Sequence, residues 1–407
     1  MAPHTADDSF SSGVCIVGAK RTPYGSFLGA LSSLSAPQLG AAAIRGALQS
    51  AAVDPQDVEE VFMGNVLGAG VGQAPARQAA LGAGLPAPTV CTTVNKVCAS
   101  GMKAVMLGAL AVQSGMSSTV VAGGMESMSN APLYLPSTAR SPGLRMGHAT
   151  LTDSMIHDGL WDPYDNVHMG ELAERCAESR GITREQQDEH AEESVGRARA
   201  AQASGLTSEE LTAVEVEGTR GRASTSVTQD EPLSKAKPER LHDLKTVFRD
   251  KDKGGTITAG NASPITDGAA ALVLMSTAAA EGRGLEILGH IAGMADAEQA
   301  PCDFPTTPAL AVQRALQRAR VNIIDVDFWE INEAFSVVDI ANRQLLGLDD
   351  DRVNVHGGSV ALGHPIGASG AAILVRLLNL MKSKGGRIGV AAICNGGGGA
   401  SAVVLRR

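Results

Sequence analysis

The sequence is poor in aromatic residues and in positive charge. Phe, Trp and Tyr make up only 3% of the 407 residues, so large rings cannot dominate the core. Asp and Glu outnumber Lys and Arg by 43 to 34, and the net charge of −9 argues against a general nucleic-acid or anionic-membrane binder. Glycine is abundant instead, with 47 residues. The composition predicts a globular protein whose core is built from small aliphatic side chains and closely approaching backbones.

The sequence has no paired-cysteine motif. Its cysteines occur singly, without a Cys-x-x-Cys pair or a spacing typical of zinc sites: Cys15, Cys91, Cys98, Cys176, Cys302 and Cys394. We therefore expect neither a structural metal nor a disulfide scaffold, and we expect a reducing compartment.

Targeting signals are also missing from the sequence. Residues 1–19 contain no Arg and no Lys, whereas a secretory signal needs a basic first segment and a transit peptide needs arginines. The last residues, Val-Val-Leu-Arg-Arg, do not form a peroxisomal signal. The uncharged stretches 104–125 and 353–375 favour buried strand–turn–helix pieces over membrane spans. We expect a cytoplasmic protein, with the mitochondrion as the alternative, and neither a membrane nor a nucleic-acid partner.

Charged residues gather in one central segment. Between Glu171 and Lys253, 32 of 83 residues are Asp, Glu, Lys or Arg, against 45 of the other 324. An exposed insertion is therefore expected between two apolar, glycine-rich halves. Short apolar strands alternate there with helical stretches, which predicts an α/β fold with a sheet covered on both faces. We expect strands at 14–17, 60–63, 119–122, 271–275, 327–331 and 387–391, and helices at 38–52, 102–114, 308–319 and 371–381.

The two halves carry a weak sequence echo. Residues 98–101 read Cys-Ala-Ser-Gly and residues 367–370 read Gly-Ala-Ser-Gly, and each set precedes an expected helix. The same strand–turn–helix context in both halves favours a duplicated domain.

Cys98 is the first candidate for chemistry. A thiol at the start of a helix faces unpaired backbone N–H groups and the positive end of the helix dipole, which favour the nucleophilic thiolate. The small residues that follow it would let a substrate approach. The alternative is a cysteine buried for packing alone.

Three further motifs place reactive groups in loops. His364 lies between glycines before Pro365 and could act as a general base, or be a turn histidine satisfied by the backbone. Cys394 precedes four glycines, 396–399, whose N–H groups could form an oxyanion hole or, less well, a phosphate cradle. Asn332 follows an expected strand and could hold a water, or cap the next helix.

The charged insertion also carries a basic run on an otherwise acidic protein. Its members are Lys235, Lys237, Arg240, Lys245, Arg249, Lys251 and Lys253. Such a run is usually a solvated face, but here it would suit a polyanionic small ligand.

Together these motifs resemble the thiolase family, from about residue 14 to residue 407. The motifs are Cys-x-Ser-Gly at 98, Asn-Glu-Ala-Phe at 332, Gly-His-Pro-x-Gly at 363 and Cys-x-Gly-Gly-Gly at 394, with His-Met-Gly at 168. Within the family they are similar to the short-chain acetyl-CoA C-acetyltransferase type. The resemblance implies reversible condensation of two acetyl-CoA to acetoacetyl-CoA and coenzyme A.

The resemblance also implies a fold and an assembly. The expected fold is α/β, a five-layered αβαβα arrangement of two similar domains with an inserted loop domain that binds coenzyme A. Its parts would be 1–128 and 261–283 for the N-terminal domain, 129–260 for the loop domain and 284–407 for the C-terminal domain. The assembly would be a homotetramer, a dimer of dimers.

By match of motif, each catalytic residue acquires a role. Cys98 would carry the acetyl group as a thioester, and His364 would deprotonate it. Cys394 would remove a proton from the methyl group of the second acetyl-CoA and later return one. His364 and a water held by Asn332 would form one oxyanion hole, and the backbone N–H groups of Cys98 and Gly396 the other.

The resemblance assigns the coenzyme A contacts as well, with coenzyme A as substrate and product and no tightly bound cofactor. The pantetheine would lie beside His168, Met169, Phe248 and Ser263. The adenosine phosphates would meet Lys235, Lys237 and Arg240.

One departure concerns potassium. Animal mitochondrial relatives of this type have a Tyr that helps to bind the ion after a Gln-Asp-x-Tyr-Ala segment. Here that segment ends in His190-Ala191, and Val195 stands in place of the Tyr. Val195 offers no oxygen ligand, which makes activation by potassium doubtful.

Other functions remain as alternatives. A degradative 3-ketoacyl-CoA thiolase of broader chain length would use the same chemistry in a wider pocket. An inactive acyl-CoA-binding subunit is a second alternative, which the three reactive residues oppose. A dinucleotide-dependent dehydrogenase is the most distant, because no well-placed Gly-x-Gly-x-x-Gly is present.

Overall fold

The computed structural model describes residues 13–135, 137–140, 143, 146, 148–218 and 223–407. Residues 1–12 lie outside this part. They include the start of the expected N-terminal domain and most of the segment searched for a targeting signal. In the described part no helix combines the length and the apolar character needed to cross a membrane.

Strands of the two halves follow the same order. The strand order is β4-β3-β5-β12-β1 in the N-terminal half and β14-β15-β16-β13 in the C-terminal half. In the C-terminal half the position that corresponds to β4 is taken by Val353, which pairs in parallel with Trp329 of β14. The N-terminal strands are β1 (Val14–Arg21), β3 (Glu60–Gly64), β4 (Val90–Val94), β5 (Thr119–Ser127) and β12 (Thr266–Ser276), which also pairs with β2 (Gly25–Ser26). The C-terminal strands are β13 (Gly289–Glu298), β14 (Phe328–Ile331), β15 (Ile388–Asn395) and β16 (Gly399–Arg406). The repeated order confirms the duplication predicted from the sequence echo.

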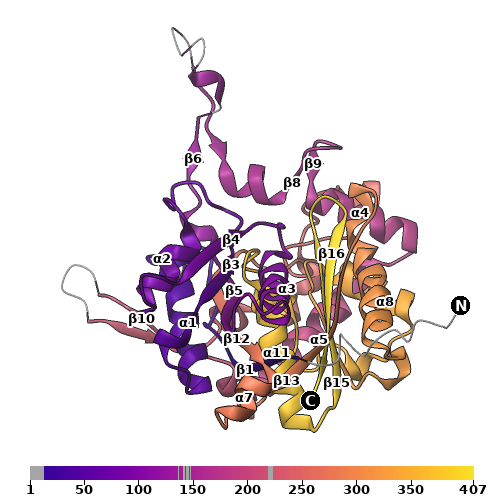
Figure 1. The fold of residues 1–407 in the computed structure, drawn as a ribbon. Helices are drawn as coiled ribbons and strands as arrows, with labels where there is room; N and C mark the ends of the chain where they lie inside the picture. The colour runs from indigo at the N-terminus through magenta and orange to yellow at the C-terminus, as the bar shows by residue number, and fades with distance from the viewer. Residues whose placement is uncertain (1–12, 136, 141–142, 144–145, 147, 219–222) are drawn as a thin grey trace, which may run out of the picture.

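Helices cover both faces of each half and form five layers. α1 (Ala36–Ala51) and α2 (Pro75–Gly82) lie outside the N-terminal strands, and α8 (Thr307–Ala319) lies outside the C-terminal strands. Between the halves lie α3 (Ser100–Gln113) and α11 (Ser369–Lys384), one from each half (Figure 1). The expected five-layered α/β fold is therefore confirmed.

Strand β12 shows why the sequence lacks an alternating pattern. Ala269, Ala271 and Val273 face the outer helices, whereas Ala270 and Leu272 face the central ones. Because both faces are covered, residues 269–275 are all apolar and this part of the strand reads as a continuous hydrophobic run.

Glycine allows the two central helices to begin almost in contact. A Cβ atom on Gly101 would lie 2.9 Å from the Ala371 nitrogen, and one on Gly370 would lie 2.6 Å from the Met102 nitrogen. A Cβ atom on Gly124 would lie 2.1 Å from the Gly367 oxygen. Any side chain at these positions would push apart the two helix starts, which carry the catalytic motifs.

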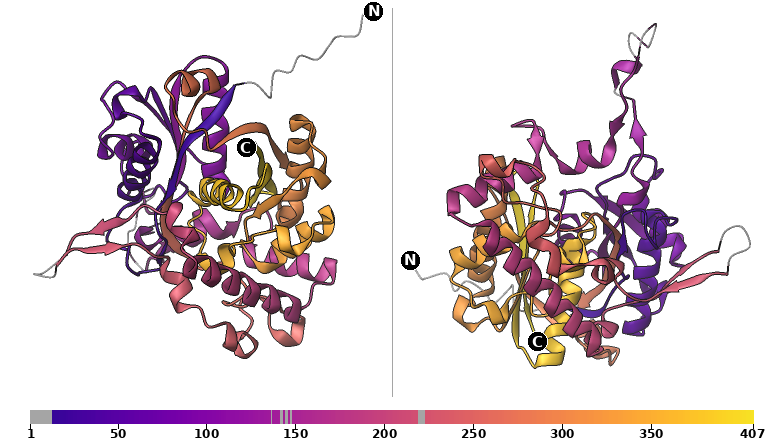
Figure 2. Two further views of the ribbon diagram at one scale, coloured as in Figure 1. Left: turned by 90° about the horizontal axis from the view of Figure 1, so that it is seen from below. Right: turned by 180° about the vertical axis from the view of Figure 1, so that it is seen from behind.

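The insertion between β5 and β12 packs over both halves. Its helices are α4 (Met169–Arg180), α5 (Arg184–Ala203) and α6 (Glu231–Lys235), and its short strands are β6 (Leu133–Tyr134), β7 (Thr152–Asp153), β8 (Trp161–Asp162), β9 (Val167–His168), β10 (Val214–Val216) and β11 (Thr225–Val227). Seen from behind in Figure 2, its long helices lie across the body, while the β6–β7 arm and the β10–β11 hairpin project from it. α5 contacts α9 (Ser336–Leu346) and α10 (Ser359–Leu362) of the C-terminal half.

Most of the expected elements are present, and several run longer than expected. The strand expected at 271–275 extends over Thr266–Ser276, and the helix expected at 38–52 spans Ala36–Ala51. The strands β4, β13 and β16 were not predicted. Edge strand β4 alternates exposed and partly buried residues, which gives it a weak apolar signal. In β16 the apolar run is short, Val403–Leu405, and follows the glycines of the Cys394 motif.

Candidate active site

A cavity of about 300 Å³ lies where the two halves and the insertion meet. Eight of the predicted site residues line it: Cys98, His168, Met169, Phe248, Ser263, His364, Cys394 and Gly396. Most of its remaining wall is apolar, including Leu160, Ile366 and Phe335. The two cysteines, 296 positions apart in the chain, thus share one small cavity with an imidazole.

A strained turn directs Cys98 into this cavity. Val97, directly before it, has a φ of 47°, in the left-handed region that β-branched residues avoid. Two hydrogen bonds hold the turn: the Val97 N–H donates to Asn95 Oδ1 at 2.9 Å, and the Ser100 hydroxyl donates to the Val97 oxygen at 2.6 Å. The Ser of the Cys-x-Ser-Gly motif therefore secures the turn that exposes the thiol.

The resting Cys98 side chain is a thiol. Burial raises its pKa to about 12, although backbone N–H groups of Gly396 and of Cys98 itself approach the sulfur and favour the thiolate. The backbone N–H groups thus favour the thiolate, as the sequence interpretation holds, but α3 begins only at Ser100 and desolvation outweighs their contribution. Cys98 therefore needs a base.

His364 can supply that base. Its Nδ1 lies 2.6 Å from the Ser369 hydroxyl, whose single proton is donated to the Pro365 oxygen at 3.0 Å. The imidazole proton must then be on Nδ1, which leaves a lone pair on Nε2. Nε2 is buried, without a hydrogen-bond partner among the described residues. Burial lowers the pKa of His364 to about 4, so the ring is neutral at neutral pH.

Glycine is required directly before this histidine. Gly363 has a φ of 110°, and a Cβ atom there would lie 2.3 Å from the Thr266 side chain. The close packing against β12 fixes the loop, which explains the glycine in the Gly-His-Pro motif.

We expect Ser369→Ala to slow the deprotonation of Cys98. Without the hydroxyl, Nδ1 loses its acceptor and the tautomer with a free Nε2 loses about 0.5–1.5 kcal/mol, or ~3- to 10-fold in rate. The measurement is the rate of Cys98 alkylation by iodoacetamide at neutral pH. Ser383→Ala, at an exposed helix end, is the control. An unchanged alkylation rate in Ser369→Ala would show that the tautomer is set in another way.

Cys394 lies at the end of β15, deeper than Cys98. It is 1% exposed, and burial raises the pKa of its thiol well above the usual range, with a further contribution from the Cys98 sulfur. Both sulfurs line the same cavity. The glycines after Cys394 bring the Gly396 N–H to the Cys98 sulfur, which supports the oxyanion-hole interpretation over the phosphate cradle.

Asn332 lies behind the cavity wall and does not line the cavity. Its Oδ1 accepts a hydrogen bond from the Ser359 hydroxyl at 2.7 Å, and its buried Nδ2 has no partner among the described residues. α9 begins after Phe335, so Asn332 does not cap that helix. An amide donor held in this way is suited to bind a water or an oxyanion.

His168 and Phe248 form one wall. Their rings stack at 4.6 Å, and Phe335 meets Phe248 edge-on at 6.1 Å. The Gly170 N–H donates to His168 Nδ1 at 3.0 Å, so the Nε2 atom carries the proton as a donor.

A basic groove continues from the cavity. This groove, of about 760 Å³, shares Ala262, Ser263 and Ile265 with the cavity wall and is lined further out by Lys235, Lys237 and Arg240. Only this part of the basic run faces the groove. Arg249 instead pairs with Glu171 and Glu178 of α4, and Lys253 pairs with Asp250. Cavity and groove together can hold a short reactive group on a long anionic carrier.

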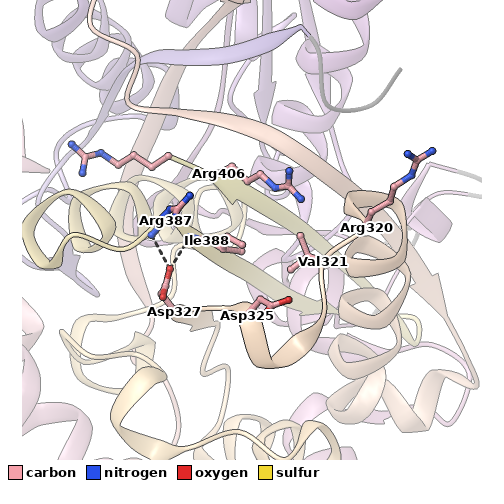
Figure 3. Close-up of a pocket in the computed structure, with 8 residues that line it drawn as sticks. Arg320, Val321, Asp325, Asp327, Arg387, Ile388 and Arg406 are labelled. Atoms are coloured by element: carbon pink, nitrogen blue, oxygen red, sulfur yellow. Dashed lines mark hydrogen bonds between the residues drawn. The ribbon is translucent and has the colours of Figure 1, made fainter. Parts of the chain in front are cut away.

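Another hollow, of about 480 Å³, lies at the outer edge of the C-terminal half and contains no predicted site residue (Figure 3). It is lined by Arg320, Val321, Asp325, Asp327, Arg387, Ile388, Arg406 and Arg407. The Asp327 carboxylate accepts the N–H groups of Arg387 and Ile388 at 2.7 and 2.9 Å. With neither thiol nor imidazole in its wall, this hollow lacks the groups for covalent chemistry.

Sequence reasoning missed several residues of the site. Ser369 belongs to the echo at 367–370, which could have identified it, and Ile366 is the variable residue of the Gly-His-Pro-x-Gly motif. Leu160 belongs to no motif and is recognisable only from its position in the wall. An isolated apolar side chain that is distant in sequence from the catalytic motifs gives no indication, in the sequence alone, that it will line the cavity.

Two thiols and an imidazole with a free lone pair, in one apolar cavity, are the groups of a cysteine-dependent transferase. The sequence matches the thiolase N-terminal domain over residues 14–278 and the thiolase C-terminal domain over residues 285–407. The chain therefore belongs to the thiolase family.

Individual relatives are similar over their whole length. Acetyl-CoA acetyltransferase 1 of Arabidopsis thaliana is 56% identical over 406 residues, covering 100% of this chain and 97% of the relative. Acetyl-CoA acetyltransferase of Saccharomyces cerevisiae is 49% identical, covering 98% and 100%. The crystal structure of Acat5 thiolase from Ascaris suum in complex with coenzyme A has a TM-score of 0.91 and 42% identity, covering 97% and 100%.

Proposed function

We propose that this protein is an acetyl-CoA C-acetyltransferase that reversibly condenses two acetyl-CoA to acetoacetyl-CoA and coenzyme A. The observation that carries the proposal is the small cavity that holds Cys98, His364 and Cys394 and opens into a basic groove. Relatives named acetyl-CoA acetyltransferase at 49–56% identity support it.

The first half-reaction acetylates Cys98. His364 Nε2 takes the thiol proton, and the thiolate attacks the thioester carbonyl carbon of acetyl-CoA. The N–H groups of Cys98 and Gly396 stabilise the oxyanion. The carbon–sulfur bond to coenzyme A breaks, and the leaving sulfur takes the proton of Cys394. This step leaves an acetylated Cys98, a protonated His364 and a Cys394 thiolate.

The second half-reaction forms the carbon–carbon bond. The Cys394 thiolate removes a proton from the methyl group of a second acetyl-CoA, and His364 with an Asn332-held water stabilises the enolate oxygen. The carbanion attacks the acetyl carbonyl on Cys98. The Cys98 sulfur leaves and takes the proton from His364, so all three groups return to their starting states.

The basic groove fits the carrier of the acetyl group. Lys235, Lys237 and Arg240 would meet the phosphates of coenzyme A, while His168, Met169, Phe248 and Ser263 would contact its pantetheine arm near the reactive sulfur. The apolar wall formed by Phe304, Leu160 and Ile366 leaves room for only a short acyl group.

We also propose that the active form is a homotetramer. β4 is the outermost strand of its sheet, with Val90 58% exposed, and the projecting β6–β7 arm exposes Leu133 and Leu151. Edge strands and apolar arms of this kind are usually covered by another subunit. A monomer in sedimentation velocity at the assay concentration would contradict this part of the proposal.

A chain-length series tests the function. We expect thiolytic cleavage of acetoacetyl-CoA to be much faster than that of 3-ketohexadecanoyl-CoA, because the cavity is small. Faster cleavage of the long substrate would favour the degradative thiolase. After incubation with acetyl-CoA, a Cys98 peptide without an added acetyl mass would favour the inactive acyl-CoA binder. Assays with and without potassium belong to the same series, because Val195 has no oxygen for the ion.

A further inference from the structure

A buried charged cluster that the proposed chemistry does not use lies behind the active site. His190 of α5 is 7% exposed, and its Nε2 lies 2.9 Å from an Asp339 oxygen and 3.6 Å from a Glu333 oxygen. Its Nδ1 contacts the Ser336 hydroxyl at 3.0 Å. Both carboxylates are 1% exposed, so their charges require compensation inside the protein.

This cluster is satisfied internally and does not resemble an empty metal site. The Arg343 guanidinium lies 3.1 Å from the same Asp339 oxygen that His190 contacts, where it would repel a divalent cation. The Glu333 oxygens also accept hydrogen bonds from Ser194 and Asn354, each at 2.9 Å. Among the described residues, the cationic groups that pair with these two carboxylates are Arg343 and, when protonated, His190.

Glu333 connects this cluster to the catalytic groups. It follows Asn332 directly, and it accepts the Val360 N–H at 3.0 Å. The neighbouring Ser359 hydroxyl donates to Asn332 Oδ1. The carboxylate packs on Gly358, where a Cβ atom would lie 2.1 Å from the Glu333 carboxyl carbon. The position of Glu333 therefore fixes the orientation of the Asn332 amide and the position of Ser359, whose hydroxyl binds that amide.

We propose that His190 is a positioning residue that, as an imidazolium, holds Glu333 and Asp339 and thereby orients the Asn332 amide for the condensation step. The inference rests on the proposed function, because it assigns the effect to one of the two half-reactions. Asn332 serves the enolate of the second acetyl-CoA, whereas acetylation of Cys98 uses the backbone N–H groups of Cys98 and Gly396. Loss of the charge on His190 should therefore slow condensation and spare acetylation.

Charge on His190 follows from its surroundings. Burial would lower its pKa and Arg343 also opposes protonation, but Glu333 and Asp339 outweigh them and raise the pKa above the ordinary value. Because the pKa of His190 is higher in the folded protein than in the unfolded chain, its charge stabilises the folded state fully at pH values below the ordinary histidine pKa. This stabilisation is lost as the pH rises through the folded-state pKa.

His190→Gln tests the proposal with two separate readouts. We expect the condensation rate to fall roughly tenfold, while acetylation of Cys98, followed by rapid-quench mass spectrometry, stays within twofold of wild type. In the wild type, condensation relative to acetylation should fall as the pH rises through the pKa of His190, and this fall should be absent in His190→Gln. His290→Gln is the control, because His290 is partly buried in β13 and its ring contacts the Thr277 hydroxyl at 3.4 Å, outside the cluster.

Asp339→Asn is the second variant, in case His190→Gln does not fold. Removing one carboxylate should lower the pKa of His190, so that the alkaline fall in condensation moves to lower pH. Equal losses in both half-reactions, unchanged condensation in His190→Gln, or a stoichiometric metal ion in the purified wild-type protein would overturn the proposal. A wild type that lacks condensation altogether would instead contradict the proposed function.

Discussion

Cys98→Ser is expected to reduce turnover by about 10⁴-fold or more, because every cycle passes through the acyl-sulfur bond. A serine hydroxyl is a far weaker acid than a thiol in the same place, so His364 would deprotonate it much less readily than Cys98. An oxygen ester would also be a poorer acyl donor than a thioester. Steady-state condensation and the mass of the peptide containing residue 98, after incubation with acetyl-CoA, measure the effect.

Cys91→Ser is the matched control for this experiment. Cys91 lies in β4, contacts the Thr89 oxygen at 3.5 Å and does not line the cavity, so its replacement should leave turnover near wild type. Turnover of Cys98→Ser within tenfold of wild type would show that another group carries the acetyl.

Cys394→Ser is expected to lower condensation by ~10²–10⁴-fold, the usual contribution of a general acid–base group. The replaced sulfur removes the methyl proton, which is the harder of the two proton transfers because a thioester α-proton is much less acidic than a thiol. Acetylation of Cys98 should persist at a reduced rate, because coenzyme A can leave as a thiolate without the proton of Cys394. The variant should therefore accumulate acetylated Cys98.

The two cysteine variants thus separate the half-reactions. Cys98→Ser should show no acetyl group at residue 98, whereas Cys394→Ser should show nearly stoichiometric acetylation in rapid-quench mass spectrometry. If Cys394→Ser condensed acetyl-CoA at the wild-type rate, the methyl proton would have to be removed by a different base.

The fold was largely predictable because its signals are local. Apolar runs such as 271–275 and helix starts such as Gly367–Gly370 are recognisable in short windows, since a strand covered on both faces is apolar throughout. The repeated strand order required the structure. The pairing of β13 with β16, for example, joins residues about a hundred positions apart, which no short window of sequence reveals.

Predictions at the site divide in the same way. The motifs identified Cys98, His364 and Cys394, and all three line the cavity. The motifs did not predict that burial would raise the pKa of Cys98 to about 12, because desolvation depends on what the rest of the chain packs against the sulfur. Nor did they indicate the roles of Ser369 and His190.

By itself, the sequence determined which chemical groups are present, which turns only glycine can form, and roughly where many of the strands and helices of the two halves lie. Tertiary structure alone decided which of these groups meet, which tautomer His364 adopts and which thiol is buried deeper. The physical reason is range: backbone conformation depends on neighbours within a few residues, whereas proximity and desolvation depend on segments that are hundreds of residues apart in the chain.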